Sequence, residues 1–330
     1  MAIFIVMDQT INPITNQPFG EMRVNDFEVL DAEDAVFFQR QLEFIKTKSY
    51  DVKYAELKFR SLWPISNEAG PGARSITYRT YDQTGMSEFI GSYAKDLPRA
   101  DIGGKETTVN VRDLGISAGW TTSEIRAAVR TGTPIDSRKL NATMRGNEQK
   151  MNLISFNGDA VRGLLGLFNH PNVPIGQVVT GVGGFLWIQK TPDEILFDLN
   201  DIARDMFTST KMIETADTML LPPEQWALIH ETSRSPNSAS DTTILQYFLK
   251  NQMWIKNVEP VNEMVGAGPG GTDVMSIYRK DPDKVTFEIP MELIYHPEER
   301  RGLEILVAAE ASCGGMIIYY PLSFSIRYNI

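Results

Sequence analysis

The spacing of apolar residues divides the N-terminal third of the chain into three segments. Residues 1–30 keep no helical or alternating period, and asparagine, proline and glycine interrupt them, which is typical of an extended arm. Residues 31–48 carry apolar side chains every three or four positions and predict a helix. Residues 56–118 are rich in β-branched and aromatic residues and predict strands at 57–65, 75–81, 86–93 and 107–116.

Turn sequences separate these strands, among them Asp101-Ile-Gly-Gly104. This much extended, polar chain exceeds what a single compact core would bury. We therefore expect a long protruding hairpin that packs against something outside its own fold.

The clearest helix of the N-terminal half is predicted over residues 134–157. Thr133 and Pro134 suit its N-cap and first turn, and Asn157-Gly158 supplies a stop. Its expected buried stripe, with a polar asparagine in the middle, consists of Leu140, Met144, Asn147, Met151 and Ile154. About 24 residues would make a helix roughly 35 Å long, so we interpret it as the spine of one domain.

From residue 163 onward helical and extended patterns alternate, which predicts an α+β fold. A capping box at Thr191-Pro-Asp-Glu194 predicts a helix start, because the threonine hydroxyl and the glutamate carboxylate bond each other's free amides. Shorter helices are predicted over 224–231 and over 242–249, the latter capped by Asp241. Strands are predicted at 218–221, 274–278, 285–289, 303–308, 315–320 and 323–327.

Composition narrows the class of protein. Of 330 residues, 42% are hydrophobic and 22% are charged, which excludes a disordered chain or a fibrous repeat. No apolar run approaches the ~20 residues that a bilayer-spanning helix needs, so we expect a soluble protein made inside the cell, without a membrane partner. Cys313 is the only cysteine, which excludes an intramolecular disulfide and a cysteine-built zinc site, and we expect it to be a small buried residue.

The charge is acidic and unevenly distributed. The chain has 32 basic and 42 acidic side chains, a net charge of −10. Residues 1–164 carry 20 basic and 21 acidic side chains, whereas residues 165–330 carry 12 and 21. An acidic protein has no general attraction to nucleic acid or anionic lipid. The asymmetry allows the near-neutral half of one copy to lie against the acidic half of another.

Residues with catalytic chemistry form no recognisable motif. His170, His230 and His296 include no helical i, i+4 pair, and we expect surface or hydrogen-bonded histidines. The segment 266–271 matches the letters G-x-G-x-x-G, but a strand pattern follows it instead of a helix, which favours a flexible loop over a dinucleotide site. We expect no catalytic, cofactor-binding or metal-binding residues, and no enzymatic activity.

A run of four charges occurs at Glu298-Glu299-Arg300-Arg301. Consecutive residues of a loop point in different directions, so these side chains do not converge easily into an acid–base site. A solvated turn or a subunit contact is the better interpretation.

The order of the segments, together with three sequence patterns, resembles the major capsid proteins of tailed phages, which have the Hong Kong 97-like fold shared by encapsulin shells. The patterns are "FNGD" followed by "GLLGLFNHPNV", then "TADTMLLPPEQWALI", and finally "CGGMIIYYPLSFSIRY". The likeness covers essentially the whole chain, and the order of these structural motifs carries it.

The resemblance implies an α+β, Hong Kong 97-like capsid fold with an N-terminal arm, an extended β-hairpin loop, a peripheral domain with a long spine helix, and an axial domain. The arm would be residues 1–30 and the extended loop region residues 56–118. The peripheral domain would comprise 31–55, 119–164 and 291–330, and the axial domain 165–290.

It further implies a structural protein whose copies form pentamers and hexamers of an icosahedral shell around double-stranded phage DNA, bound without sequence specificity. The shell would be the virion capsid, assembled in the bacterial host cytoplasm, with portal, scaffolding or decoration proteins as further partners. Two alternatives are an encapsulin-like shell that holds a protein cargo and an unrecognised enzyme that forms a small oligomer.

Charge places candidate subunit contacts within this scheme. Lys95, Arg99 and Lys105 cluster near the Asp101–Gly104 turn predicted above, where a hairpin can reach the acidic half of a neighbour. Glu298 and Arg300, from the four-charge run, are the other candidates.

Overall fold

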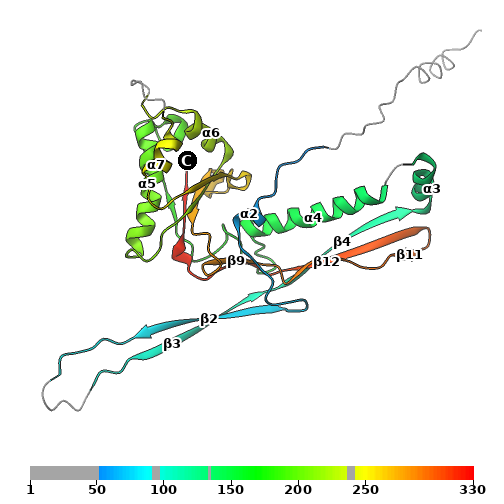
Figure 1. The fold of residues 1–330 in the computed structure, drawn as a ribbon, viewed down its shortest axis with the longest axis horizontal. Coiled ribbons are helices and arrows are strands. Elements are labelled where there is room, and N and C mark those ends of the chain that lie inside the picture. Colours follow the sequence, from blue (N-terminus) through cyan, green and yellow to red (C-terminus); the bar gives the residue numbers. More distant parts are fainter. Residues whose placement is uncertain (1–51, 91–96, 133–134, 236–241) are drawn as a thin grey trace, which may run out of the picture. The chain divides into compact units, whose positions relative to one another are not determined.

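The computed structural model describes residues 52–90, 97–132, 135–235 and 242–330 (Figure 1). The chain divides into two compact units, residues 1–55 and 56–330, and the fold below is that of the second unit. The predicted arm and the predicted helix over 31–48 lie outside the described residues.

Helices and strands occur in comparable proportion, which confirms the α+β class. The α-helices are α2 (Phe59–Leu62), α3 (Thr122–Thr131), α4 (Ile135–Asn157), α5 (Pro192–Ser209), α6 (Pro223–Glu231) and α7 (Ile244–Asn251). Short 3-10 helices are η2 (Trp187–Gln189), η3 (Asn262–Met264), η4 (Pro269–Gly271) and η5 (Pro321–Ser323).

The strands of the described residues form four sheets. The two-stranded sheet pairs β2 (Ser75–Thr84) with β3 (Asp101–Asn110). A three-stranded sheet contains β1 (Ile65–Ser66), β9 (Val285–Glu288) and β13 (Gly315–Ile318). In a four-stranded sheet, β12 (Glu304–Cys313) pairs with β4 (Arg112–Thr121), β10 (Met291–Tyr295) and β11 (Glu299–Arg301). The order of the five-stranded sheet is β5 (Ile175–Gln177), β14 (Phe324–Tyr328), β8 (Val274–Tyr278), β6 (Thr218–Leu221) and β7 (Asn257–Pro260).

Two hydrophobic cores lie on opposite faces of the five-stranded sheet. All five residues of β8 are buried, and alternate side chains of a strand point to opposite faces. Val274 and Tyr278 accordingly belong to the first core, whereas Met275 and Ile277 belong to the second. Strand β8 therefore contributes side chains to both cores and connects them.

The spine helix is confirmed as α4, and Met151 and Ile154 are fully buried in the first core. Met144, however, is 57% exposed. The buried stripe begins at Thr143, whose hydroxyl donates to the Leu140 carbonyl at 2.7 Å and lies 3.0 Å from the Tyr295 hydroxyl. A hydrogen-bonded threonine thus occupies the buried position that the apolar pattern of the sequence assigns to the next residue, Met144.

Three of the strands predicted between 57 and 116 differ from the structure. Residues 57–65 contain helix α2, because Phe59 and Leu62, three positions apart, both turn into the core. Residues 86–90 form no strand, and 91–93 lie outside the described part. The predicted strand 107–116 is interrupted at Val111 between β3 and β4, and the predicted Asp101–Gly104 turn is the first part of β3.

The last strand of the chain pairs outside the sheet of β12. Strand β14 pairs with β8 and β5, in the same sheet as β6 and β7, instead of returning to the sheet of β12. The residues around β14 in the sequence do not indicate this pairing, because segments far along the chain decide which strands pair.

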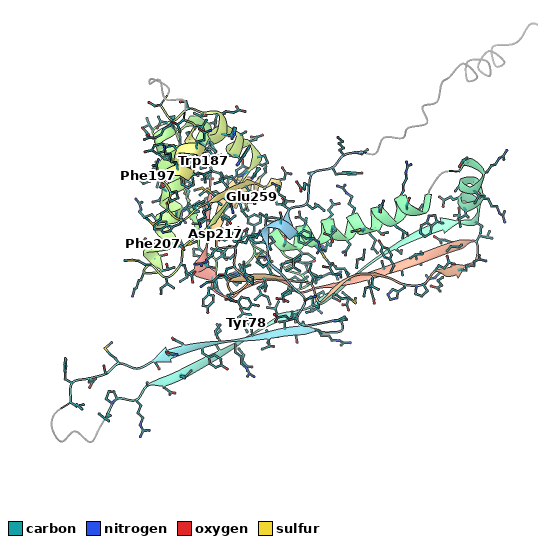
Figure 2. All side chains as sticks on the ribbon, viewed as in Figure 1. Tyr78, Trp187, Phe197, Phe207, Asp217 and Glu259 are labelled. Carbon is teal, nitrogen blue, oxygen red and sulfur yellow. The ribbon has the colours of Figure 1, made fainter. Side chains whose placement is uncertain are left out.

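The second core contains a buried ion pair. Lys190 Nζ lies 2.5 Å from Asp198 Oδ2, and both side chains are almost wholly inaccessible. Lys190 also donates to the Val179 carbonyl at 2.7 Å. The indole N–H of buried Trp187, which Figure 2 labels, donates to Asp198 at 3.0 Å. Burial raises the pKa of Asp198, while Lys190 and Trp187 oppose that rise. The pair fastens the loop before α5 to the helix itself.

The capping box that begins α5 confirms its prediction: Thr191 Oγ1 accepts from the Glu194 amide and Glu194 accepts from the Thr191 amide. The cap of α7 differs from its prediction, because Thr243 is the N-cap residue. Asp241, the predicted cap, lies outside the described residues.

Substituting Met151→Asp should lower the free energy of unfolding by at least about 3 kcal/mol, because it places an unpaired charge in the first core. The matched control is Met144→Asp on the same helix, whose exposed side chain should change stability by less than about 0.5 kcal/mol. Urea unfolding of both variants measures this. Equal losses would show that α4 does not bury the face described here.

Substituting Lys190→Met should cost about 3–5 kcal/mol at pH 7, because it leaves the Asp198 carboxylate buried without a cation. The loss should shrink toward pH 5. Without Lys190 the pKa of Asp198 rises further above its unfolded value, and stability that depends on a raised pKa is present at low pH and disappears as pH rises through that pKa.

Urea unfolding at the two pH values provides the test. Adding Asp198→Leu to Lys190→Met is the control and should recover most of the loss. A loss that is independent of pH and unaffected by the second substitution would contradict this account of the pair.

Candidate functional site

The described residues contain no group of three or more histidine, cysteine or acidic side chains placed to hold a metal ion. Within these ranges, no helix combines the length and apolar character needed to cross a membrane. The three histidines make ordinary structural contacts. His170 is buried, which lowers its pKa, His230 stacks on Trp226, and His296 Nε2 lies 3.1 Å from Glu310 Oε1.

The glycine-rich segment 266–271 leads through the short helix η4 into strand β8. A strand follows it, as the sequence predicts, in the place where a dinucleotide fingerprint would have a helix N-terminus. Buried Cys313 likewise confirms its expectation, and burial raises the pKa of its thiol to about 11.

The two-stranded sheet of β2 and β3 contributes no residue to either hydrophobic core. Ten residue pairs hold it together, from Ser75 opposite Asn110 to Thr84 opposite Asp101. In the described part of the chain neither strand pairs with any third strand. Nearly every side chain beyond the first few pairs is exposed. A hairpin of this kind is marginal on its own, because it has no face to bury.

The base of the hairpin is fixed to the rest of the unit. The Tyr78 ring packs edge-on against Tyr319 with centroids 5.1 Å apart (Figure 2), and Val109 is buried. The Tyr319 hydroxyl lies 3.2 Å from Thr286 Oγ1, and burial raises the pKa of Tyr319. The amide of Val111, between β3 and β4, donates to the Arg74 carbonyl at 2.9 Å. These contacts set the direction in which the hairpin leaves the unit.

The far part of the hairpin displays large apolar side chains to solvent. Their exposed fractions lie between 59% and 109%, and they are Tyr81, Met86, Phe89, Ile90, Leu97 and Ile102. Several large exposed apolar side chains on one segment are typical of a surface that contacts another protein.

The predicted interface residues are all on the surface where the structure describes them. Lys105 lies in β3 and Arg99 just before it, whereas Lys95 falls outside the described residues. Glu298 precedes β11 and Arg300 lies within it, so the predicted loop over 298–301 is largely a strand. Arg300 is opposite Ile305 of β12, and long-range pairing of this kind has no local signal in four consecutive charges.

Lys105 and Arg300 belong to different sheets, so the structure does not gather the described candidates in one sheet.

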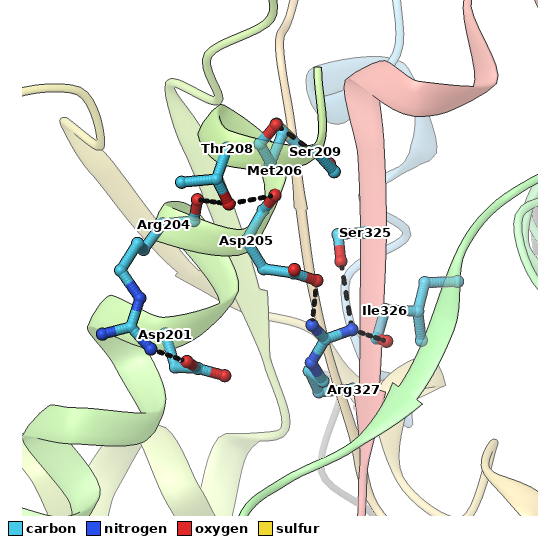
Figure 3. Close-up of polar contacts among 9 residues, drawn as sticks. All are labelled: Asp201, Arg204, Asp205, Met206, Thr208, Ser209, Ser325, Ile326 and Arg327. Carbon is cyan, nitrogen blue, oxygen red and sulfur yellow. Dashed lines mark hydrogen bonds and ion pairs between the residues drawn. The ribbon is translucent and has the colours of Figure 1, made fainter. Parts of the chain in front are cut away.

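A group of charged residues that sequence reasoning missed joins α5 to β14 (Figure 3). The Arg327 guanidinium pairs with Asp205 of α5 and also donates to Ser325 Oγ and to the Ile326 carbonyl, each at 3.4 Å. Asp201 pairs with Arg204 one turn earlier on the helix. Arg327 and Asp205 are 122 positions apart, so spacing along the chain could not reveal this contact, which stabilises the second core.

Two further apolar areas border the second core. The loop before α5 exposes Val182 and Ile188 at 97% and 81%. A cavity of about 260 Å³ beyond the C-terminal end of α5 is lined by Ser209, Thr210, Lys211, Ile213, Glu214, Tyr320, Pro321 and Leu322. Its one acidic residue, Glu214, already pairs with Lys284 at 2.6 Å, so the cavity offers mainly an apolar contact.

Comparison with known proteins agrees with a structural role. The profile of the family described as Major capsid protein matches residues 85–330. No curated protein matches the chain significantly.

Solved capsid structures share its fold at low sequence identity. The capsid of Myoviridae phage XM1 is 17% identical and has a TM-score of 0.77, over 88% of this chain and 98% of that one. The capsid of the native GTA particle has 10% identity and a TM-score of 0.62, over 91% and 99%. Mycobacterium phage Ogopogo gives 14% identity and a TM-score of 0.55, over 88% and 98%.

These similarities confirm the Hong Kong 97-like α+β fold, and the match over residues 85–330 shows that the chain belongs to the major capsid protein family.

Proposed function

We propose that copies of this chain assemble through the β2–β3 hairpin into an icosahedral shell that encloses double-stranded phage DNA. The observation that carries the proposal is the exposed hairpin, whose root is fixed by Tyr78 and Val109 while its far part has no partner among the described residues. The resemblance of the sequence and membership of the capsid family support the same function.

The exposed apolar side chains supply the driving force for this assembly. Full burial of one large apolar side chain contributes about 1.5–3 kcal/mol, and six such residues lie on the far part of the hairpin. A neighbouring copy that covers them would also protect strand edges that otherwise invite aggregation. Because the hairpin and the surface it covers are different patches, the contact is heterologous and closes into rings, which form pentamers and hexamers.

Strand pairing supports a revised division into domains. We assign residues 119–164 and 291–318 to the peripheral domain and residues 165–290 to the axial domain, and β14 joins the axial domain through its pairing with β8. Residues 31–55 remain with the peripheral domain and residues 1–30 with the arm on the grounds of sequence alone. Residues 56–118 form the extended loop region, rooted by α2 and β1.

Charge adds selectivity to the contact. We assign Lys95, Arg99 and Lys105 to an interface with the acidic C-terminal half of a neighbour, and Glu298 and Arg300 to a second contact along β11. Exposed ion pairs contribute only about 0–1 kcal/mol each, but a shell repeats every contact many times.

The net charge of −10 fits a wall that confines DNA without binding it tightly. In this proposal the chain has no enzymatic activity, the shell forms in the bacterial host cytoplasm, and portal, scaffolding or decoration proteins complete it.

Shortening the hairpin tests the proposed function. Tyr78 and Thr107 face each other in the sheet, so an Asn-Gly turn can replace residues 79–106 and close a short hairpin on the intact root. The shortened protein should keep the melting temperature of the full chain, because the removed side chains lie outside both cores. It should form no closed shells, since the contact between copies is gone.

Electron microscopy and size-exclusion chromatography of the two proteins, expressed in parallel, provide the readout. The full-length chain is the control and should give megadalton particles. Closed particles of normal size from the shortened protein would contradict the role of the hairpin, and a full-length chain that runs only as a small oligomer would contradict assembly itself.

A further inference from the structure

The register of the hairpin sorts its side chains into two faces. Residues that are directly opposite share a face, and successive residues alternate. One face, here called the Tyr81 face, contains Ser75, Thr77, Arg79, Tyr81 and Gln83 of β2 with Asn110, Thr108, Glu106, Gly104 and Ile102 of β3. The other, the Tyr78 face, contains Ile76, Tyr78, Thr80, Asp82 and Thr84 with Val109, Thr107, Lys105, Gly103 and Asp101.

The Tyr78 face is already used at its base. Tyr78 packs on Tyr319, and Val109 is 6% exposed. A Cβ placed on Gly314 would lie 3.4 Å from the Ile76 side chain, so Ile76 also points toward the body of the unit. At its root the Tyr81 face therefore points away from the chain's own core.

The far part of the Tyr78 face resists burial because its charges do not balance. Asp82 and Asp101 stand with Lys105, which is opposite Thr80, and none of the three forms an ion pair among the described residues. A partner surface that covered the whole of this face would need one cation for each carboxylate as well as an anion for Lys105, since burial of an unpaired charge is unfavourable.

On the Tyr81 face, in contrast, four polar side chains pair with one another across the two strands. Arg79 Nε lies 2.8 Å from Glu106 Oε1, directly across the strands. The hydroxyls of Thr77 and Thr108 lie 2.8 Å apart. Covering these pairs leaves no charge without a counter-charge.

The same face carries the large apolar residues of the two strands that remain exposed. The Tyr81 ring lies over Gly104, and one ring carbon is 3.4 Å from the position that a Cβ of residue 104 would take. Because glycine has no side chain, the ring packs directly against the backbone of the sheet. Ile102, the diagonal neighbour of Tyr81 across the strands, is 65% exposed, and Tyr81 is 67% exposed. An aromatic ring held against backbone is a rigid anchor, which loses little freedom when a partner covers it.

We infer that the Tyr81 face, and not the Tyr78 face, is the side of the hairpin that packs against a second copy of this chain, with Tyr81 and Ile102 as its apolar anchors. This inference rests on the proposed function, since it selects one face of the hairpin that mediates assembly. The surface of the second copy that receives it is uncharged or balanced in charge at the contact, because Arg79 and Glu106 already neutralise each other.

Cysteine labelling of adjacent positions tests this choice. The only native cysteine, Cys313, is fully buried, so background labelling by a maleimide is low. Gln83→Cys places a thiol on the Tyr81 face and Thr84→Cys places one on the Tyr78 face, and both native side chains are exposed. On assembly, labelling of Gln83→Cys should slow by at least about tenfold, whereas labelling of Thr84→Cys should change by less than about threefold, because an interface core excludes solvent.

A second measurement uses substitutions that leave the body untouched. Tyr81→Asp should prevent or strongly reduce particle formation, whereas Thr80→Asp, the neighbouring position on the other face, should assemble at nearly the same protein concentration as the unmodified chain. Unchanged melting temperatures in both variants would establish that neither substitution affects folding.

The outcomes separate this inference from the proposed function. Particles in which both positions are labelled equally, or in which only Thr84→Cys is protected, would overturn the choice of face while leaving assembly intact. Failure of the unmodified chain to form particles would overturn the proposed function itself.

Discussion

A sheet of two strands has no interior, and the organisation of this protein follows from that constraint. Ten residue pairs of β2 and β3 project their side chains to two faces, and among the described residues only the first few positions of one face pack against the rest of the unit. The strands and the segments 85–90 and 97–100 that continue them include a tyrosine, a phenylalanine and four aliphatic side chains exposed by 59% or more. A chain that keeps such a hairpin needs another molecule to complete it, and a shell of identical copies supplies one.

A hairpin can direct assembly only if its root does not move, and the rest of the fold provides that rigidity. Strand β3 continues through buried Val111 into β4, which pairs with β12 along its full length. Strand β8 contributes to both hydrophobic cores, so the two cannot shift independently. The Arg327–Asp205 contact and the buried Lys190–Asp198 pair hold α5 against the sheet and fix the loop before it. Preorganisation of this kind reduces the entropy lost when copies associate.

The sequence predicts those elements whose signals are local. The capping box at Thr191, the strands β6 and β8 and the helix α4 all follow from spacing and caps within a few residues. Prediction fails where a distant contact decides the outcome. Thr143 takes the buried position expected for Met144 because Tyr295, far along the chain, meets its hydroxyl.

In the candidate interface, too, local features follow from the sequence and features that depend on distant contacts do not. A long hairpin could be expected from composition, but its register could not, because Gly103 and Gly104 resemble a turn in the sequence. In the structure they are strand residues opposite Asp82 and Tyr81. The strand at Glu299–Arg301 is likewise set by its pairing with β12. Lys105 was expected at a turn and lies in a strand, on the face whose charges do not balance, so its proposed contact is at the edge of the interface and not at its centre.

Hydrogen exchange measured by mass spectrometry on unassembled protein and on purified particles tests the central claim most directly. If a neighbouring copy completes the hairpin, amides of Ser75–Thr84 and Asp101–Asn110 exchange at least about tenfold more slowly in particles, whereas the buried strand Val274–Tyr278 is equally protected in both states. Equal exchange of the hairpin amides in the two states would contradict the claim that assembly covers this hairpin.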